Sequence, residues 1–118
     1  MTDLRQTMGA EQQLKSIFKQ AQGYAFDYAD GAAERSVFPQ PEALANLALF
    51  DEDMPNTNGD ASSILQQLHQ YGSPASVAQT GGCYFGFVNG GVIPVTLATK
   101  WLTDFWDQNT ALQVMSPI

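Results

Sequence analysis

The chain has 118 residues with 5 basic and 12 acidic side chains, giving a formal net charge of −7, and this length fits one domain rather than two. Charged residues make up 14% of the chain and hydrophobic residues 44%, a composition too apolar for disorder throughout. No Lys or Arg occurs between Ser36 and Thr99, so the long basic patch that nucleic acids and anionic membranes require cannot be built there. We therefore expect neither a nucleic acid nor a membrane as partner.

Two features of the sequence bear on its compartment. The segment from Met1 to Arg5 lacks the basic stretch followed by an apolar one that marks a signal peptide. Cys83 is the single cysteine, so no internal disulfide can form. Both features predict a cytoplasmic protein.

Apolar spacing predicts that the first half of the chain is helical. A first helix is expected from about Gly9 to Asp30, because apolar residues recur there at three- and four-residue steps. Gly31 is expected to end this helix, since glycine tolerates the left-handed conformation found at many helix ends.

Capping residues and prolines predict the shorter helices that follow. A helix is expected over 41–50 with proline at its first position, and another over 60–71 with Asp60 as its N-cap. The acidic run over 51–59 is expected to be a loop. Ser-Pro introduces a further short helix, expected over 73–79.

The character of the sequence changes at residue 81. Residues 83–88 are mostly aromatic and apolar and are expected to be extended, before an Asn-Gly-Gly turn. Pro94 is expected to open a helix to about Asn109 that is apolar around more than half of its circumference, as in helices buried on most sides. We therefore divide the chain into a helical segment, 1–80, and a glycine–aromatic loop plus helix, 81–118.

The residue inventory contains no recognisable catalytic, cofactor-binding or metal site. His69, the only histidine, has no Cys, Asp or Glu three or four positions away, so a hydrogen-bonded or exposed helical histidine is expected rather than a ligand or base. Cys83 has no activating cation near it in sequence and is expected as a small buried residue. The glycines over 81–91 match neither a phosphate loop nor a dinucleotide fingerprint. They leave two interpretations open, a close approach to a ligand or a turn between packed elements.

Four motifs occur in order in the second half of the chain. They read Tyr-Gly-Ser-Pro-Ala-Ser-Val-Ala from 71, Tyr-Phe-Gly-Phe-Val-Asn-Gly-Gly-Val-Ile-Pro from 84, Trp-Asp-Gln-Asn from 106 and Met-Ser-Pro from 115. Together with Phe-Pro-Gln-Pro-Glu-Ala-Leu from 38, this series resembles the N-terminal part of the group II pyridoxal-phosphate-dependent decarboxylases. This family comprises the aromatic-amino-acid, glutamate, aspartate and related decarboxylases, and the resemblance extends over about 38–118.

The resemblance implies a mostly α-helical N-terminal segment of an enzyme of the aspartate-aminotransferase type (fold type I), whose α/β domain lies downstream. Such a segment wraps the partner subunit in this family, which implies a homo-oligomer, a dimer or higher. The residues that hold pyridoxal phosphate in the family also lie downstream, and neither Lys100 nor His69 occupies their motifs. We therefore expect no cofactor and no activity on this chain alone, and an amino acid as substrate of the full-length protein.

The resemblance also implies two walls of a substrate pocket. The glycine–aromatic loop matches the segment that touches the substrate side chain in family members, which assigns this role to Phe87, Val88 and Asn89. The Asp-Gln-Asn-Thr-Ala segment matches a second wall and assigns it to Asn109 and Ala111, with packing under the N-terminal helices as the open alternative. Aromatic decarboxylases carry further aromatic and Pro-Thr residues where this chain has Val-Asn, which disfavours an aromatic substrate.

A second interpretation does not depend on the resemblance. The chain would then be a stand-alone, small, acidic helical module that presents the region from Glu42 to Asp60 to a basic partner. Ser116 and Pro117 favour the decarboxylase interpretation. A serine N-cap followed by a proline in the first turn is typical of the start of a helix, and the sequence stops there.

Overall fold

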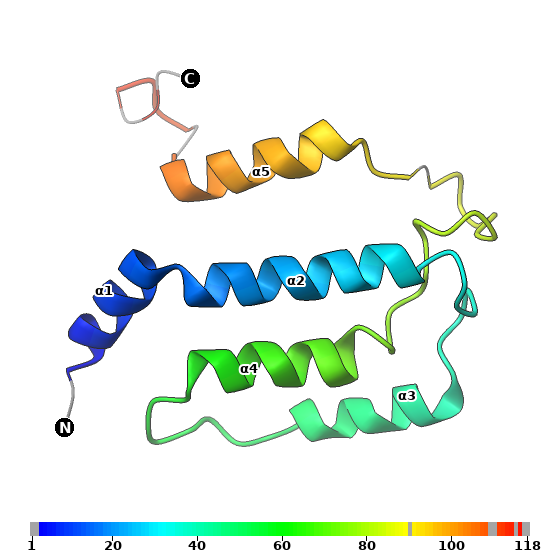
Figure 1. The fold of residues 1–118 in the computed structure, drawn as a ribbon, viewed down its shortest axis with the longest axis horizontal. Coiled ribbons are helices and arrows are strands. Elements are labelled where there is room, and N and C mark those ends of the chain that lie inside the picture. Colours follow the sequence, from blue (N-terminus) through cyan, green and yellow to red (C-terminus); the bar gives the residue numbers. More distant parts are fainter. Residues whose placement is uncertain (1–2, 90, 109–110, 115, 117–118) are drawn as a thin grey trace.

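The computed structural model describes residues 3–89, 91–108, 111–114 and 116. This part of the chain is mostly helical, as the sequence predicts, and contains no β-strand. The elements, drawn in Figure 1, are α1 (Leu4–Leu14), α2 (Ser16–Gly31), α3 (Pro41–Ala45), the 3₁₀-helix η1 (Asn46–Phe50), α4 (Ala61–Gln67), the π-helical turn η2 (Leu68–Gly72) and α5 (Pro94–Trp106).

The expected single helix over 9–30 is wrong, because two helices meet at Lys15. This residue has a left-handed backbone (φ 57°), and its N–H donates to the carbonyl of Glu11 to close α1. The apolar spacing continues on both sides of the break, so periodicity alone does not reveal it. Gly31 is the last residue of α2 but does not adopt a positive φ, and the chain leaves through Ala32 in the right-handed helical conformation. The expected left-handed glycine end is therefore also wrong.

Three predicted helix starts are confirmed. Pro41 and Pro94 occupy the first turns of α3 and α5. Asp60 caps α4, where its Oδ2 accepts from the backbone N–H of Ser63 at 2.8 Å and from the Ser63 hydroxyl at 2.7 Å. The acidic stretch over 51–59 has no helix, as expected. After Ala45 the third helix tightens into 3₁₀ geometry, which is common at the ends of short helices.

Two expected segments in the second half are wrong. Residues 73–76 form turns instead of a helix, and residues 81–89 form irregular turns instead of an extended segment. α5 ends at Trp106, followed by Asp107 with φ 49°. The expected end at Asn109 lies outside the described residues.

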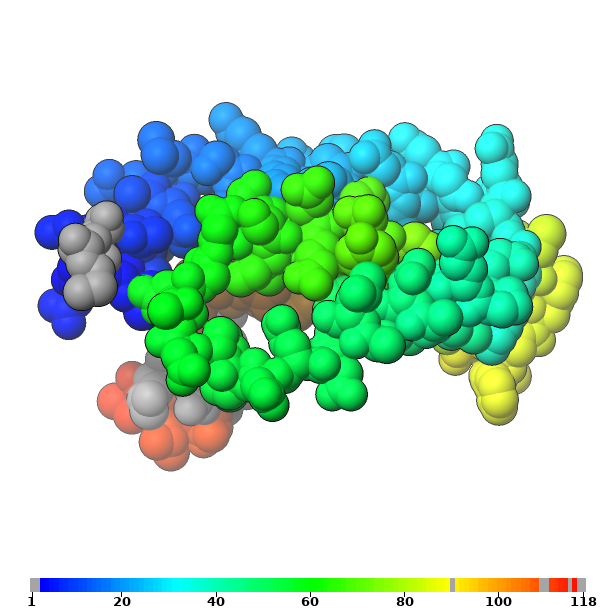
Figure 2. Space-filling model, turned by 90° about the horizontal axis from the view of Figure 1, so that it is seen from below, coloured from blue at the N-terminus to red at the C-terminus, as the bar shows by residue number. Residues whose placement is uncertain are grey.

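The helices lie side by side around α2. In Figure 1, α5 lies along one side of α2 and α4 along the other, with α3 beyond α4. α4 packs on α2 and η1 on η2, and Figure 2 shows the side chains of α4 against those of α2. The contact between α2 and α5 includes the rings of Phe18 and Phe105, whose centroids lie 5.1 Å apart in an edge-to-face arrangement.

The chain buries little apolar surface of its own. Among the described residues the buried hydrophobic side chains are Ala32 and Ala78. The accessible surface is 9792 Å², whereas a compact protein of this mass exposes about 6,300 Å². The radius of gyration is 17.6 Å, against about 13.5 Å for a compact chain of this length. Every residue of α5 is exposed, so the burial expected for this helix is not met within the chain.

Candidate functional site

The Phe87–Asn89 turn carries the first three predicted substrate residues. Phe87 and Val88 both have left-handed backbones, with φ of 53° and 56°, a strained conformation for a β-branched residue. Their side chains are 93% and 102% exposed relative to an extended reference. Strained turns of this kind cluster at binding and active sites. The turn therefore presents two apolar side chains outward from a constrained backbone.

Two long hydrogen bonds and one close approach shape this turn. The backbone N–H of Asn89 donates to the carbonyl of Gly86 at 3.3 Å, and its side-chain amide donates to Oε1 of Gln79 at 3.4 Å. A side chain at Gly86 would meet the Tyr84 hydroxyl at 2.7 Å, so the tyrosine lies against the glycine backbone. Cys83, expected to be buried, is exposed, because residues 81–89 do not pack beneath another element.

The second predicted wall lies at the other end of α5. Ala111 is exposed in a turn beyond the helix, and Asn109 lies outside the described residues. A helix of 13 residues is about 20 Å long, and Figure 1 shows the segment before α5 and the segment after it at opposite ends of this helix. The assignment of both segments to a substrate pocket stays a prediction.

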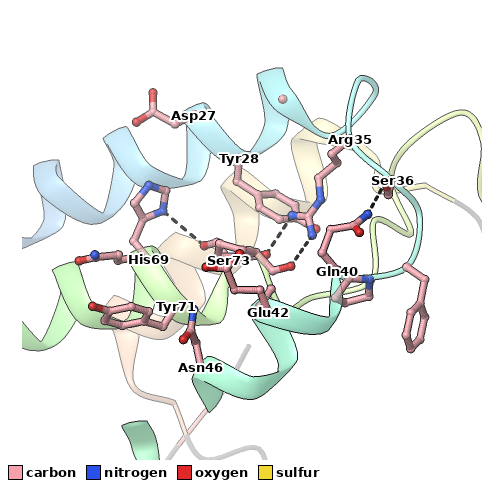
Figure 3. Close-up of a pocket in the computed structure, with 16 residues that line it drawn as sticks. Asp27, Tyr28, Arg35, Ser36, Gln40, Glu42, Asn46, His69, Tyr71 and Ser73 are labelled. Carbon is pink, nitrogen blue, oxygen red and sulfur yellow. Dashed lines mark hydrogen bonds between the residues drawn. The ribbon is translucent and has the colours of Figure 1, made fainter. Parts of the chain in front are cut away.

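Arg35, to which the sequence assigned no role, makes three side-chain hydrogen bonds to a segment 38 to 41 positions away. Its Nη1 donates to the carbonyl of Ser73 at 2.9 Å, and its Nη2 donates to those of Pro74 at 2.9 Å and Ser76 at 2.7 Å. The guanidinium carbon lies 5.4 Å from the centre of the Tyr28 ring on α2. Figure 3 shows the guanidinium reaching across from the connection after α2 to this segment.

These contacts explain why residues 73–79 do not form the expected helix. Three of their carbonyls accept from Arg35 instead of lying along a helix axis. One sequence signal could have indicated such a role. Arg35 is the only cation between Lys19 and Lys100, and it has no acidic residue three or four positions away to form a local ion pair.

An open cavity of 690 Å³ lies beside Arg35, between the end of α2, α3 and η2. His69 lines it, with its ring stacked on Tyr24 at 4.1 Å between centroids and its Nδ1 3.3 Å from the Ser73 hydroxyl oxygen. The expectation of a hydrogen-bonded helical histidine is confirmed. No described carboxylate hydrogen-bonds the other ring nitrogen, so the serine–histidine pair lacks the group that orients a catalytic base.

The described residues do not fit a pyridoxal phosphate site. Lys100 forms an exposed ion pair with Asp104 at 3.2 Å, whereas an aldimine-forming lysine is activated by desolvation or a neighbouring cation. Among the described residues that line the cavity, Arg35 is the one Lys or Arg, and its guanidinium donates to backbone carbonyls. No group of three potential metal ligands occurs among the described residues.

Comparisons with known proteins add no family assignment. No protein-family model, no curated protein and no solved structure matches this chain. In the described part, no helix is long and apolar enough to cross a membrane.

Proposed function

We propose that this chain acts as the helical N-terminal part of a pyridoxal-phosphate-dependent amino-acid decarboxylase, where it contributes substrate-pocket residues and subunit contacts. One observation supports this best. Residues 84–94 carry one whole family motif, and between 84 and 108 the Phe, Val, Ile, Leu and Trp residues are each at least 46% exposed. Exposed apolar side chains are expected in a segment that is covered by another domain and by a partner subunit in the full-length protein.

The amount of uncovered surface fits such a role. The chain exposes about 3,500 Å² more than a compact protein of its mass, and one side of a standard protein interface buries about 800 Å². The excess is therefore larger than one ordinary interface. Coverage by both a downstream domain and a second subunit accounts for it.

Under this proposal the downstream domain carries out the chemical steps, and this chain contributes only side chains that contact the substrate. When bound, the cofactor of this family withdraws electrons from the substrate as carbon dioxide leaves. Phe87 and Val88 would supply an apolar wall beside the substrate side chain, and the Asn89 amide would supply a hydrogen bond. The group that forms the bond to the cofactor would come from the downstream domain.

Reading the transcript beyond the codon for Ile118 tests this proposal. We expect an in-frame α/β domain with a cofactor lysine, and an encoded enzyme that releases carbon dioxide from an amino acid. Asn89→Ala should lower kcat/KM about tenfold by removing one hydrogen bond to the substrate, while the matched Asn58→Ala change in the acidic loop should leave it unchanged. A stop codon directly after Ile118 would reject the proposal.

A stand-alone acidic interaction module is the second candidate, and one observation favours it. Asp51, Glu52 and Asp53 are exposed and, within the described residues, form no ion pair. Such a module should bind a basic peptide with an affinity that falls as salt rises. Neutralising these three residues should abolish that binding, whereas a decarboxylase segment should show none.

A further inference from the structure

We infer that Arg35 is a positioning residue for the Phe87–Asn89 turn. Its guanidinium fixes residues 73–76, and the segment that follows holds the turn through Gln79. The inference rests on the proposed function, because only there does the turn line a substrate pocket. Three sets of contacts connect the Arg35 guanidinium to the Phe87–Asn89 turn. We call them links, and a substitution can test each one separately.

The first link is the guanidinium itself. All three of its hydrogen bonds are 2.7–2.9 Å long and end on carbonyls within one turn of chain. Hydrogen bonds from a charged donor are stronger than neutral ones. Tyr28 flanks the guanidinium, and the Tyr28 hydroxyl lies 3.0 Å from the hydroxyl oxygen of Ser76. A lysine ammonium cannot reproduce this planar fork, although it would keep the charge.

The second link fastens the chain after residue 76. The N–H of Ala78 donates to the carbonyl of Val37 at 2.9 Å, and Ala78 is 1% exposed. A side chain at Gly81 would lie 2.7 Å from the carbonyl oxygen of Ala32, so the two backbones touch there. Residues 73–81 are thus held against the connection between α2 and α3 at both of their ends.

The third link reaches the turn. Gln79 lies inside the fastened segment and accepts the side-chain hydrogen bond of Asn89 at 3.4 Å. Two consecutive left-handed residues persist only where neighbouring contacts hold them, and this bond ties the turn to the helical part. This bond couples the position of the predicted substrate residues to that of residues 73–81.

The contact between α2 and α4 does not depend on Arg35 and serves as an internal control. Gln20 on α2 donates to the carbonyl of Ser62 on α4 at 3.0 Å, and the Ser62 hydroxyl donates to Oε1 of Gln20 at 2.9 Å. A change at Arg35 should therefore free the segment from 73 to 89 while leaving α4 in place.

Amide hydrogen exchange on the 118-residue chain, followed by NMR, tests the first two links. Arg35→Lys should accelerate exchange of the Ala78 N–H by about tenfold or more, with less than about a twofold change in α4. The control Arg5→Lys, at an exposed arginine of α1, should change neither. Unaltered exchange at Ala78 would overturn the inference, and so would equal acceleration in α4, because Arg35 would then only support the fold.

Gln79→Ala tests the third link without touching Arg35. It should shift the side-chain amide resonances of Asn89 and leave the exchange of Ala78 as it was; unshifted resonances would overturn the inference. In the full-length enzyme, Arg35→Lys should raise KM for the amino acid more than it lowers kcat, as loss of substrate positioning predicts. A full-length protein without decarboxylase activity would reject the proposed function and leave the exchange results standing, so the two failures are distinguishable.

Discussion

Polar contacts between distant segments hold residues 16–81 together, whereas the apolar side chains of residues 82–108 are half exposed in α5 and almost fully exposed in the glycine–aromatic turn. The first region has the Arg35 contacts with residues 73–76 and the reciprocal bonds of Gln20 and Ser62. The second has an exposed glycine–aromatic turn and an exposed α5, joined to the first by the Asn89–Gln79 hydrogen bond and by the ring pair Phe18–Phe105.

Charge separates the same two regions. Residues 16–81 contain eight acidic and two basic side chains, and residues 82–108 contain two and one. Repulsion between acidic surfaces therefore concentrates in the first region, while the second is nearly neutral and apolar. The apolar side chains of this chain therefore form no core of their own and are available for contact with another surface.

The largest expected loss of stability comes from a substitution at Gly81, in the first region. In Gly81→Ala the new methyl group would lie 2.7 Å from the Ala32 carbonyl oxygen, so the backbones must move apart at a cost of about 2 kcal/mol in unfolding free energy. Gly82→Ala is the matched control, because no atom lies within 4 Å of that position. Urea denaturation followed by circular dichroism measures both, and equal stability of the two variants would contradict the close approach.

A smaller effect tests whether the two regions are joined. Phe105→Ala removes the edge-to-face contact with Phe18, and the chain should lose about 1 kcal/mol of stability. Phe85→Ala removes a phenyl ring that is exposed and should leave the urea midpoint unchanged. Identical midpoints for both variants would show that α5 is not docked on α2 in solution.

The start of α4 should respond to acid. The pKa of Asp60 lies below its ordinary value of 3.8, because first the hydroxyl and then the backbone N–H of Ser63 stabilise the carboxylate. A lowered pKa in the folded chain means that this contribution is complete above the ordinary value and is lost as the pH falls through the lowered one.

Circular dichroism at acidic pH measures the response to protonation of Asp60. Helix content should fall slightly as Asp60 becomes protonated. Asp60→Ser keeps a capping oxygen without a titrating group, so the difference between the two pH profiles isolates the carboxylate. Superimposable profiles would show that protonation does not weaken this cap.

The smallest expected loss of stability comes from removing an ion pair on α5. Lys100 and Asp104 form an ion pair that is largely exposed on both sides, and such a pair contributes about 0.3 kcal/mol. Lys100→Gln should therefore shift the urea midpoint barely measurably. A loss several times larger would show that another surface covers this face of α5 under the conditions of the measurement.

Local sequence signals predicted much of the helical fold. Pro41, Asp60 and Pro94 begin helices where the sequence places them, because capping and proline geometry depend on residues within one turn. The break at Lys15 escaped prediction, since a single left-handed residue leaves the apolar spacing on either side intact.

The candidate site was less accessible to sequence reasoning. Phe87, Val88 and Asn89 were named through motif resemblance, but their strained and exposed turn could not be derived from their identities. Arg35 was missed because its partners lie 38 to 41 positions along the chain, beyond any local pattern. The same long-range bonds replaced the helix expected over 73–79.

Sedimentation velocity of the 118-residue chain, with binding of a dye for exposed apolar surface, tests most directly whether the second region is a contact surface. The account predicts an associated species and dye binding, and a Trp101→Gln, Phe105→Gln double variant that loses both. Met54→Gln, which removes an exposed apolar side chain from the acidic loop, should behave like the parent chain. A parent chain that sediments as a 12.8 kDa monomer and binds no dye would contradict the account.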